Sequence, residues 1–176
     1  MIQRLQSLLL LLAAVANFTL LFMPIWMVSN PDQDSGDDIH VVAYPSGVEY
    51  NASHMSIDNP FEQKKISYSE NIFLTIHFFL TISLSVFLLA IIFLYINRQR
   101  QISLTQAGLV FLLVQFLMLI PLRSYLEEMA GTPGADYQSL PQYGLGLPLL
   151  ALLLTWWASK RIKKDERMVR DMDRIR

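Results

Sequence analysis

The chain has 176 residues, of which 53% are hydrophobic and 16% are charged, and its formal net charge is −1. Soluble domains carry about 25% charged residues, so this charged fraction is low, and the mean hydropathy of the chain is +0.35. The apolar residues gather in four long blocks, which excludes a single water-soluble domain. The absence of cysteine excludes disulfides and thiol chemistry, and the near-neutral charge gives no attraction for nucleic acid. No phosphate-binding glycine loop, GxSxG or HExxH motif occurs, so we predict no catalytic, cofactor-binding or metal-binding residues.

The first apolar block, residues 7–28, predicts a membrane-spanning helix. It carries no charge over 22 residues, which is about 33 Å of helix against a bilayer core of roughly 30 Å. The alternative is a cleaved signal peptide, with Arg4 in its basic region and a cleavage site after Ala16. The apolar run continues twelve residues past Ala16, and this favours the membrane span.

Residues 29–70 form the larger loop between the first two blocks. The loop opens with the acidic, turn-rich stretch NPDQDSGDD and continues with the β-branched runs IHVVAY and VEYNA on either side of a Pro-Ser-Gly turn. The second part predicts a β-hairpin. Because an isolated hairpin is marginally stable in water, we expect it to lean on the membrane surface, on the second outer loop or on a partner.

Three further apolar blocks predict spans at about 71–96, 103–122 and 143–159, with a second outer loop at 123–142. The runs are long and continuous, as in helices, whereas strands of membrane barrels alternate over about ten residues. Pro121 predicts a kink at the end of the third block. We therefore predict an all-α membrane protein in one domain, 1–176, a bundle of four transmembrane helices with a small β-hairpin in its first outer loop.

The charge distribution predicts the orientation of this bundle. The N-terminus, the segment 97–102 and the tail 160–176 together hold eleven of the fourteen Lys and Arg residues but only four of the fifteen Asp and Glu residues. The positive-inside bias therefore places both termini in the cytoplasm. Trp156 and Trp157 fall at the basic end and Trp26 at the acidic end, where aromatic belts are found.

The tail is the candidate partner-binding segment. Opposite charges recur at helical spacing along it, as in Glu166 with Arg170 and Arg161 with Asp165, and predict a charged helix that continues from the fourth span or bends away from it. Two interpretations remain open, an anchor on anionic lipid headgroups and a helix that binds a cytosolic protein. The residues concerned are Arg161, Lys163, Lys164, Asp165, Glu166, Arg167, Arg170, Asp173, Arg174 and Arg176.

The predicted spans contain no Asp, Glu, Lys or Arg in their interiors, which speaks against a proton-coupled pump, a voltage sensor and an intramembrane protease. The remaining candidates are the neutral polar residues Asn17, His77, Thr81, Ser85 and Gln115. Residues 77, 81 and 85 are four apart and share one helix face. We interpret this set as hydrogen bonding between helices; a polar path, or a role of His77 as a proton relay, is the alternative.

Both ends of the chain resemble a known family. Met1-Ile2-Gln3-Arg4, Lys164-Asp165-Glu166, Val169-Arg170 and Asp173-Arg174-Ile175-Arg176 are similar to small four-span membrane proteins of Bacteroidota that are catalogued as domain of unknown function 4293. The resemblance implies a bacterial inner membrane and a four-helix arrangement. It supplies no activity, cofactor or catalytic residue.

These observations predict a multi-pass membrane protein that is not an enzyme. We expect an accessory or scaffold subunit that presents its basic cytoplasmic tail to a partner. The alternative is a small transporter or permease component with a polar path near Asn17, His77 and Gln115. The expected partners are the lipid bilayer and a protein, or a second copy of the chain, bound through the spans or the tail. No cofactor is expected.

Overall fold

The computed structural model describes residues 3–31, 38–52, 62–66, 72–129 and 138–174. The chain forms two compact units. The helical unit comprises Met1–Thr19, Leu80–Phe116 and Leu147–Arg176, and the sheet unit comprises Leu20–Phe79 and Leu117–Gly146.

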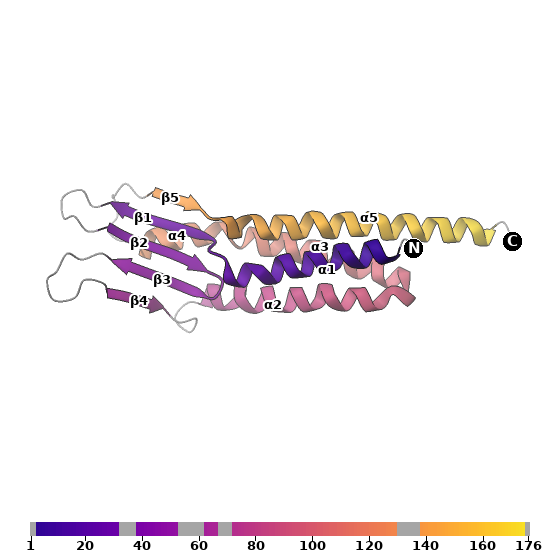
Figure 1. Cartoon of the computed structure of the whole chain (residues 1–176), viewed down its shortest axis with the longest axis horizontal. Helices are drawn as coiled ribbons and strands as arrows, with labels where there is room; N and C mark the ends of the chain where they lie inside the picture. The colour runs from indigo at the N-terminus through magenta and orange to yellow at the C-terminus, as the bar shows by residue number, and fades with distance from the viewer. Residues whose placement is uncertain (1–2, 32–37, 53–61, 67–71, 130–137, 175–176) are drawn as a thin grey trace. The chain divides into compact units, whose positions relative to one another are not determined.

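Each of the four apolar blocks overlaps one long helix, as predicted, although the bounds differ (Figure 1). Helix α1 is Gln3–Thr19, α2 is Ile72–Phe93, α3 is Arg98–Leu117 and α5 is Gly146–Arg174. The 3-10 turns η1 and η3 follow α1 and α2, and η4 precedes α5; their bounds are Leu20–Phe22, Leu94–Ile96 and Tyr143–Leu145.

Three segments of the described chain are long and apolar enough to cross a membrane: Leu5–Phe22, Ile72–Ile96 and Arg98–Leu126. They correspond to the first three predicted spans. The fourth predicted span, 143–159, lies at the start of α5, where only fourteen helical residues precede Lys160. This is shorter than the roughly 20 residues that a bilayer core requires.

Each long helix buries a narrow stripe of residues that are three or four apart. In α5 the stripe is Ala151, Thr155, Ala158 and Ile162, all at most 1% exposed. Side chains from all four helices join in one core cluster that includes Leu10, Leu88 and Leu112 beside residues of α5. Small residues in these stripes let helix backbones approach closely, as in membrane helix packing.

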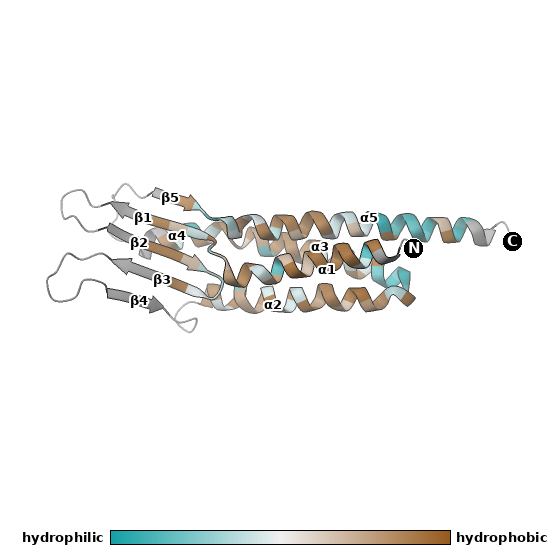
Figure 2. Ribbon diagram, in the orientation of Figure 1, coloured by the Kyte–Doolittle hydropathy of each residue, from teal (hydrophilic) through white to brown (hydrophobic). Residues whose placement is uncertain are grey.

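The opposite faces of these helices are apolar and exposed. Val15, Val86, Val110 and Leu153 are 53%, 59%, 60% and 58% exposed. Figure 2 shows that hydrophobic residues make up most of the helical ribbon before the charged end of α5. A surface helix of a soluble protein presents charged residues on its outer face. Polar residues inside and apolar residues outside are what a helix in contact with lipid requires.

The sheet unit contains five antiparallel strands in the order β4-β3-β2-β1-β5 (Figure 1). The bounds are Trp26–Pro31 for β1, Asp38–Tyr44 for β2, Gly47–Ala52 for β3, Glu62–Ile66 for β4 and Gln138–Pro141 for β5. Strands β2 and β3 form the predicted hairpin, with Tyr44 opposite Gly47. Gly47 has a φ of 150°, a backbone angle that residues other than glycine rarely adopt.

The structure corrects the all-α prediction, because the hairpin is the centre of a five-stranded sheet. Strands β1 and β4 pair with its two sides, and β5 from the second outer loop pairs with β1. The second outer loop, one of the three supports expected for the hairpin, joins the same sheet, but its strand β5 pairs with β1 and not with the hairpin itself. The physical reason is that a lone hairpin buries too little surface, whereas three or more strands with one apolar face are stable.

The first predicted span, 7–28, also ends differently. Helix α1 ends at Thr19, and residues 26–31 are strand β1. Pro24 lies between them and has no N–H to continue a helix. Beyond it, Ile25 donates a backbone hydrogen bond to Ala43 of β2 at 2.8 Å, so the last apolar residues of the block belong to the sheet unit.

The third predicted span, 103–122, is interrupted near its end. Helix α3 ends at Leu117, and α4, Ile120–Met129, begins after two intervening residues. The ring of Pro121 would clash with the carbonyl of residue 117 in a continuous helix, so the predicted kink is a break. Helix α4 contacts β1 and β2, and its Leu122 and Leu126 are buried.

Candidate functional site

Four of the five predicted intramembrane polar residues meet in the helical unit. Asn17 of α1 lies with Nδ2 3.1 Å from the carbonyl oxygen of Thr81 and 3.0 Å from Oγ of Ser85, both on α2. Ser85 donates its hydroxyl to the same carbonyl at 2.8 Å, and Nε2 of Gln115 on α3 donates to Oγ1 of Thr81 at 2.9 Å. All four side chains are at most 3% exposed. This polar cluster therefore joins three helices around Thr81.

Each of the two amides of the polar cluster has an oxygen atom for which the described structure shows no hydrogen-bond donor. The Asn17 amide has a fixed orientation, because the carbonyl of Thr81 only accepts and so must face Nδ2. Within the described structure, Oδ1 of Asn17 and Oε1 of Gln115 are buried and have no hydrogen-bond partner. A buried acceptor without a donor costs free energy, so these two oxygens are where a water molecule or a polar ligand would bind.

His77, the fifth predicted residue, belongs to the sheet unit. It lies on α2, one turn before Thr81, and its side chain is 3% exposed. The shared helix face predicted for residues 77, 81 and 85 agrees with the burial of all three. The structure thus supports a common face on α2, on which Thr81 and Ser85 receive the hydrogen bonds of Asn17 and Gln115.

The predicted tail is the second half of one continuous helix, α5. Glu166 and Arg170 form the predicted ion pair, with Oε1 and Nε 3.2 Å apart. The sequence predicts that Asp165 pairs with Arg161; in the structure its carboxylate is 9% exposed and accepts a hydrogen bond from Nε2 of Gln6 on α1. The tail is thus attached to the helical unit as far as Asp165.

The other tail candidates lie around this attachment point. Lys164, Arg167 and Arg170 are exposed, while Arg161 and Lys163 are partly covered. The side chains of Asp173, Arg174 and Arg176 lie outside the described residues.

The contact of Gln6 with Asp165 is the feature that sequence reasoning missed. A pocket beside it is lined by Gln6, Asp165, Tyr95, Arg98 and Gln101, with Ser7 and Ile162, and has a volume of about 10 Å³, enough for about one water molecule. The spacing of the buried stripe in α5, continued by three residues from Ile162, reaches Asp165. That spacing could have identified Asp165 as an inward-facing residue.

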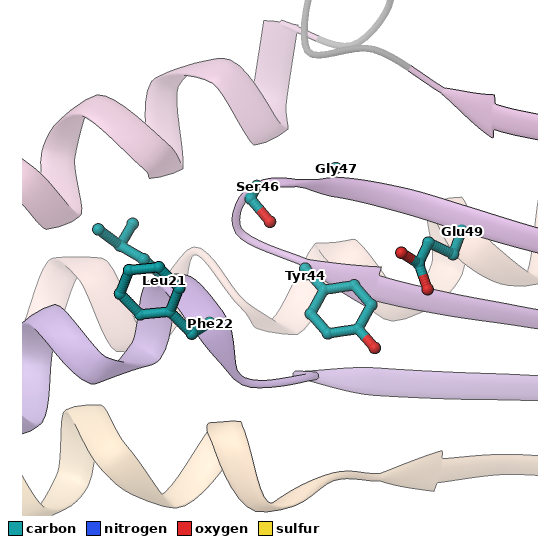
Figure 3. A pocket seen from close by; sticks show the side chains of 6 residues that line it. All are labelled: Leu21, Phe22, Tyr44, Ser46, Gly47 and Glu49. Carbon is teal, nitrogen blue, oxygen red and sulfur yellow. The ribbon is translucent and has the colours of Figure 1, made fainter.

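A shallow pocket in the sheet unit has a volume of about 260 Å³ and lies at the hairpin turn. Figure 3 shows the phenol of Tyr44 and the carboxylate of Glu49 on neighbouring strands, with Leu21 and Phe22 from η1 near the turn. The lining joins aromatic, apolar and acidic groups. No predicted site residue lines this pocket.

Among the described residues, no group of three or more His, Asp or Glu side chains could hold a metal ion. The absence of a cofactor remains a prediction. The polar cluster offers neutral amides and hydroxyls, which can pack helices or bind a small polar molecule. The tail offers ion pairs and exposed cations, which can bind an anionic or protein surface.

The comparison with known families matches the chain over nearly its whole length. The model of a family described as Domain of unknown function (DUF4293) matches residues 2–175. No curated protein matches the chain.

Proposed function

The chain belongs to the DUF4293 family, and from its structure we propose that it is an integral inner-membrane protein with an accessory or scaffold function. In this proposal α1, α2, α3 and α5 cross the bilayer as a four-helix bundle with both termini in the cytoplasm. Strands β1 to β5 then lie outside the membrane, and α5 presents its charged end to a cytosolic protein.

The observation that most supports membrane insertion is that polar residues are buried and apolar residues are exposed in the helical unit. Asn17, Thr81 and Gln115 are fully buried, while Val86, Val110 and Leu153 are more than half exposed. In water this arrangement would lose the hydrophobic stabilisation that drives folding. In lipid it satisfies the polar groups internally and leaves apolar side chains against the acyl chains.

Helix α5 belongs in the bundle although its apolar segment is short. Ala151, Ala158 and Ile162 pack in the same core cluster as residues of the other three helices. Leu153 and Trp156 face outward at 58% and 48% exposure. A helix that packs along three spanning helices and shows lipid an apolar face must cross with them, and Lys160 can extend its ammonium to the interface.

The charged end of α5 supports the scaffold role. The hydrogen bond of Gln6 to Asp165 ties α5 to α1, and Arg167, Arg170 and Asp171 beyond it are exposed. A rigid helix that projects a defined charge pattern suits recognition by a protein, because little conformational entropy is lost on binding.

The experiment is photo-crosslinking in intact cells, with a photoreactive amino acid at Met168 of the full-length chain. We expect a discrete protein adduct, whose mass distinguishes another protein from a second copy of the chain. The matched variant is E166R/R170E, which keeps the ion pair, the helix and the net charge but reverses the charge pattern. Loss of the adduct in this variant supports recognition of the tail; an unchanged adduct, or lipid adducts alone, contradicts it.

The second candidate is a small transporter or permease component with a polar path near Asn17, His77 and Gln115. The partnerless oxygens of Asn17 and Gln115 favour it, because polar groups inside a membrane mark the paths of polar substrates. Replacement of Gln115 by Leu would abolish the uptake of the polar substrate if this path operates. Unchanged growth and uptake with Q115L, in a variant that retains the fold, would exclude it.

A further inference from the structure

One face of α5 changes from apolar to basic along a single line. Leu149, Leu153 and Trp156 are 42%, 58% and 48% exposed, and Lys160 and Lys164 continue the line at spacings of three or four residues. Residues so spaced lie above one another on a helix. The opposite face is buried, so this line is the outer face of the helix.

The basic part of the line forms a groove. Its volume is about 300 Å³, and it is lined by Lys160, Lys163, Lys164, Arg167, Met168 and Asp171. Four cations thus surround a space with one carboxylate at its far end. A tetrahedral anion with several acceptor oxygens fits this set, because lysine and arginine bind phosphate oxygens by charge-assisted hydrogen bonds.

Lys160 marks the boundary between the two parts. Its Nζ lies 3.6 Å from the centre of the Trp156 ring, a cation–π contact that places one positive charge directly above the apolar strip. From Lys160 to Arg167 the helix rises about 10 Å, which is comparable to the headgroup layer at one side of a bilayer.

We propose that this face of α5 binds an anionic phospholipid, with the phosphate in the basic groove and an acyl chain along Leu149, Leu153 and Trp156. The proposal rests on the membrane insertion proposed above. The apolar strip next to the groove favours a phospholipid as the source of the phosphate, because an acyl chain can pack on the strip whereas a free phosphate ion has no apolar part. Charged residues of α5 that do not line the groove, such as Arg170, remain available to a cytosolic protein.

The test uses the full-length protein in phosphatidylcholine vesicles that contain phosphatidylglycerol. The chain has three tryptophans, so Trp26→Phe and Trp157→Phe are introduced into the parent protein, which is called the wild type in this test, and into each variant. The fluorescence of Trp156 is then quenched by bromine atoms on the acyl chains of either lipid, at equal mole fraction. The wild type is expected to show stronger quenching by the brominated phosphatidylglycerol. The variant K164Q/R167Q removes two cations of the groove and leaves Lys160 on Trp156, so the fluorophore keeps its environment.

The control variant is R100Q/R170Q, which removes two exposed cations of the same proposed side of the membrane that do not line the groove. The preference for phosphatidylglycerol should fall roughly tenfold in K164Q/R167Q, because each cation contributes to binding at an anionic surface, and should persist in the control. The absence of a preference for phosphatidylglycerol in the wild type would overturn the proposal. An equal loss of the preference in both variants would also overturn it, because the preference would then come from the overall positive charge and not from the groove.

Inorganic phosphate, added at constant ionic strength, separates the two sources of the anion. An unchanged lipid preference supports the lipid; displacement by phosphate assigns the groove to the free anion and overturns the proposal. The orientation of the tail is measured separately. A tail outside the cell with an intact lipid preference would refute the proposed topology alone, and a cytoplasmic tail without the preference would refute the lipid site alone.

Discussion

The side-chain amide of Gln6 donates a hydrogen bond to the buried carboxylate of Asp165, 159 residues later in the chain. This contact joins the first turn of α1 to the tail half of α5. It is the last polar attachment of α5 described before residues 167, 168, 170 and 171, which are exposed. The tail is therefore a rigid extension of the helical unit as far as residue 165.

Replacement of Asp165 by Ala is expected to loosen this extension. It removes a hydrogen bond to a charged group, which contributes roughly 1.5–3 kcal/mol, and leaves the Gln6 amide buried without an acceptor. Amide hydrogen exchange in residues 160–171 should accelerate. Asp171→Ala, at an exposed position of the same helix, should leave the exchange rates unchanged; equal acceleration in both variants would show that the contact with Gln6 does not hold the tail.

The polar cluster should contribute measurably to the stability of the helical unit. Asn17→Leu removes the hydrogen bonds to Thr81 and Ser85, and we expect a loss of about 1–2 kcal/mol, because interhelical hydrogen bonds in membranes contribute about 0.6–1 kcal/mol each. Thermal unfolding in detergent measures the loss. Thr19→Val is the control, since Thr19 bonds only within its own helix, to Val15 at 2.8 Å. A stability of Asn17→Leu equal to that of the control would argue against a packing role.

Substitution by alanine is expected to have different effects on stability at Gly144 and at Gly146, although these residues are only two positions apart. A Cβ atom on Gly144 would collide with the carbonyl oxygen of Pro24, to which its own N–H donates at 3.0 Å, whereas a Cβ on Gly146 meets nothing within 4 Å. Gly144→Ala should destabilise the sheet unit by about 1–3 kcal/mol. Gly146→Ala should change stability by less than about 0.5 kcal/mol. Limited proteolysis of the sheet unit would report both, and similar effects of the two substitutions would refute the close approach at Gly144.

The long helices and the hairpin could be predicted because their signals are local. Continuous apolar runs indicated α1, α2, α3 and the start of α5, and the Pro-Ser-Gly turn indicated the β2–β3 hairpin. The periodic burial of Thr81 and Ser85 followed from their spacing of four.

Other features depend on contacts that sequence patterns do not specify. The residues Trp26–Val28 are apolar whether they end a helix or begin a strand, and periodicity does not separate the two in a short run; Pro24 was the available signal. Strand β5 pairs with β1 across more than a hundred residues, and no local pattern shows this partner. The sequence pairs Asp165 with Arg161, which lies one helical turn away, whereas Gln6 is a partner that only the fold brings near.

The orientation of the chain in the membrane tests the account most directly. The sequence has no cysteine, so single cysteines can be placed at two exposed positions, Ser46→Cys in the hairpin turn and Lys164→Cys in the tail. A membrane-impermeant maleimide applied to intact spheroplasts should label Ser46→Cys, and should label Lys164→Cys only after the membrane is disrupted. Labelling of Lys164→Cys in intact spheroplasts, or protection of Ser46→Cys, would contradict the proposed topology.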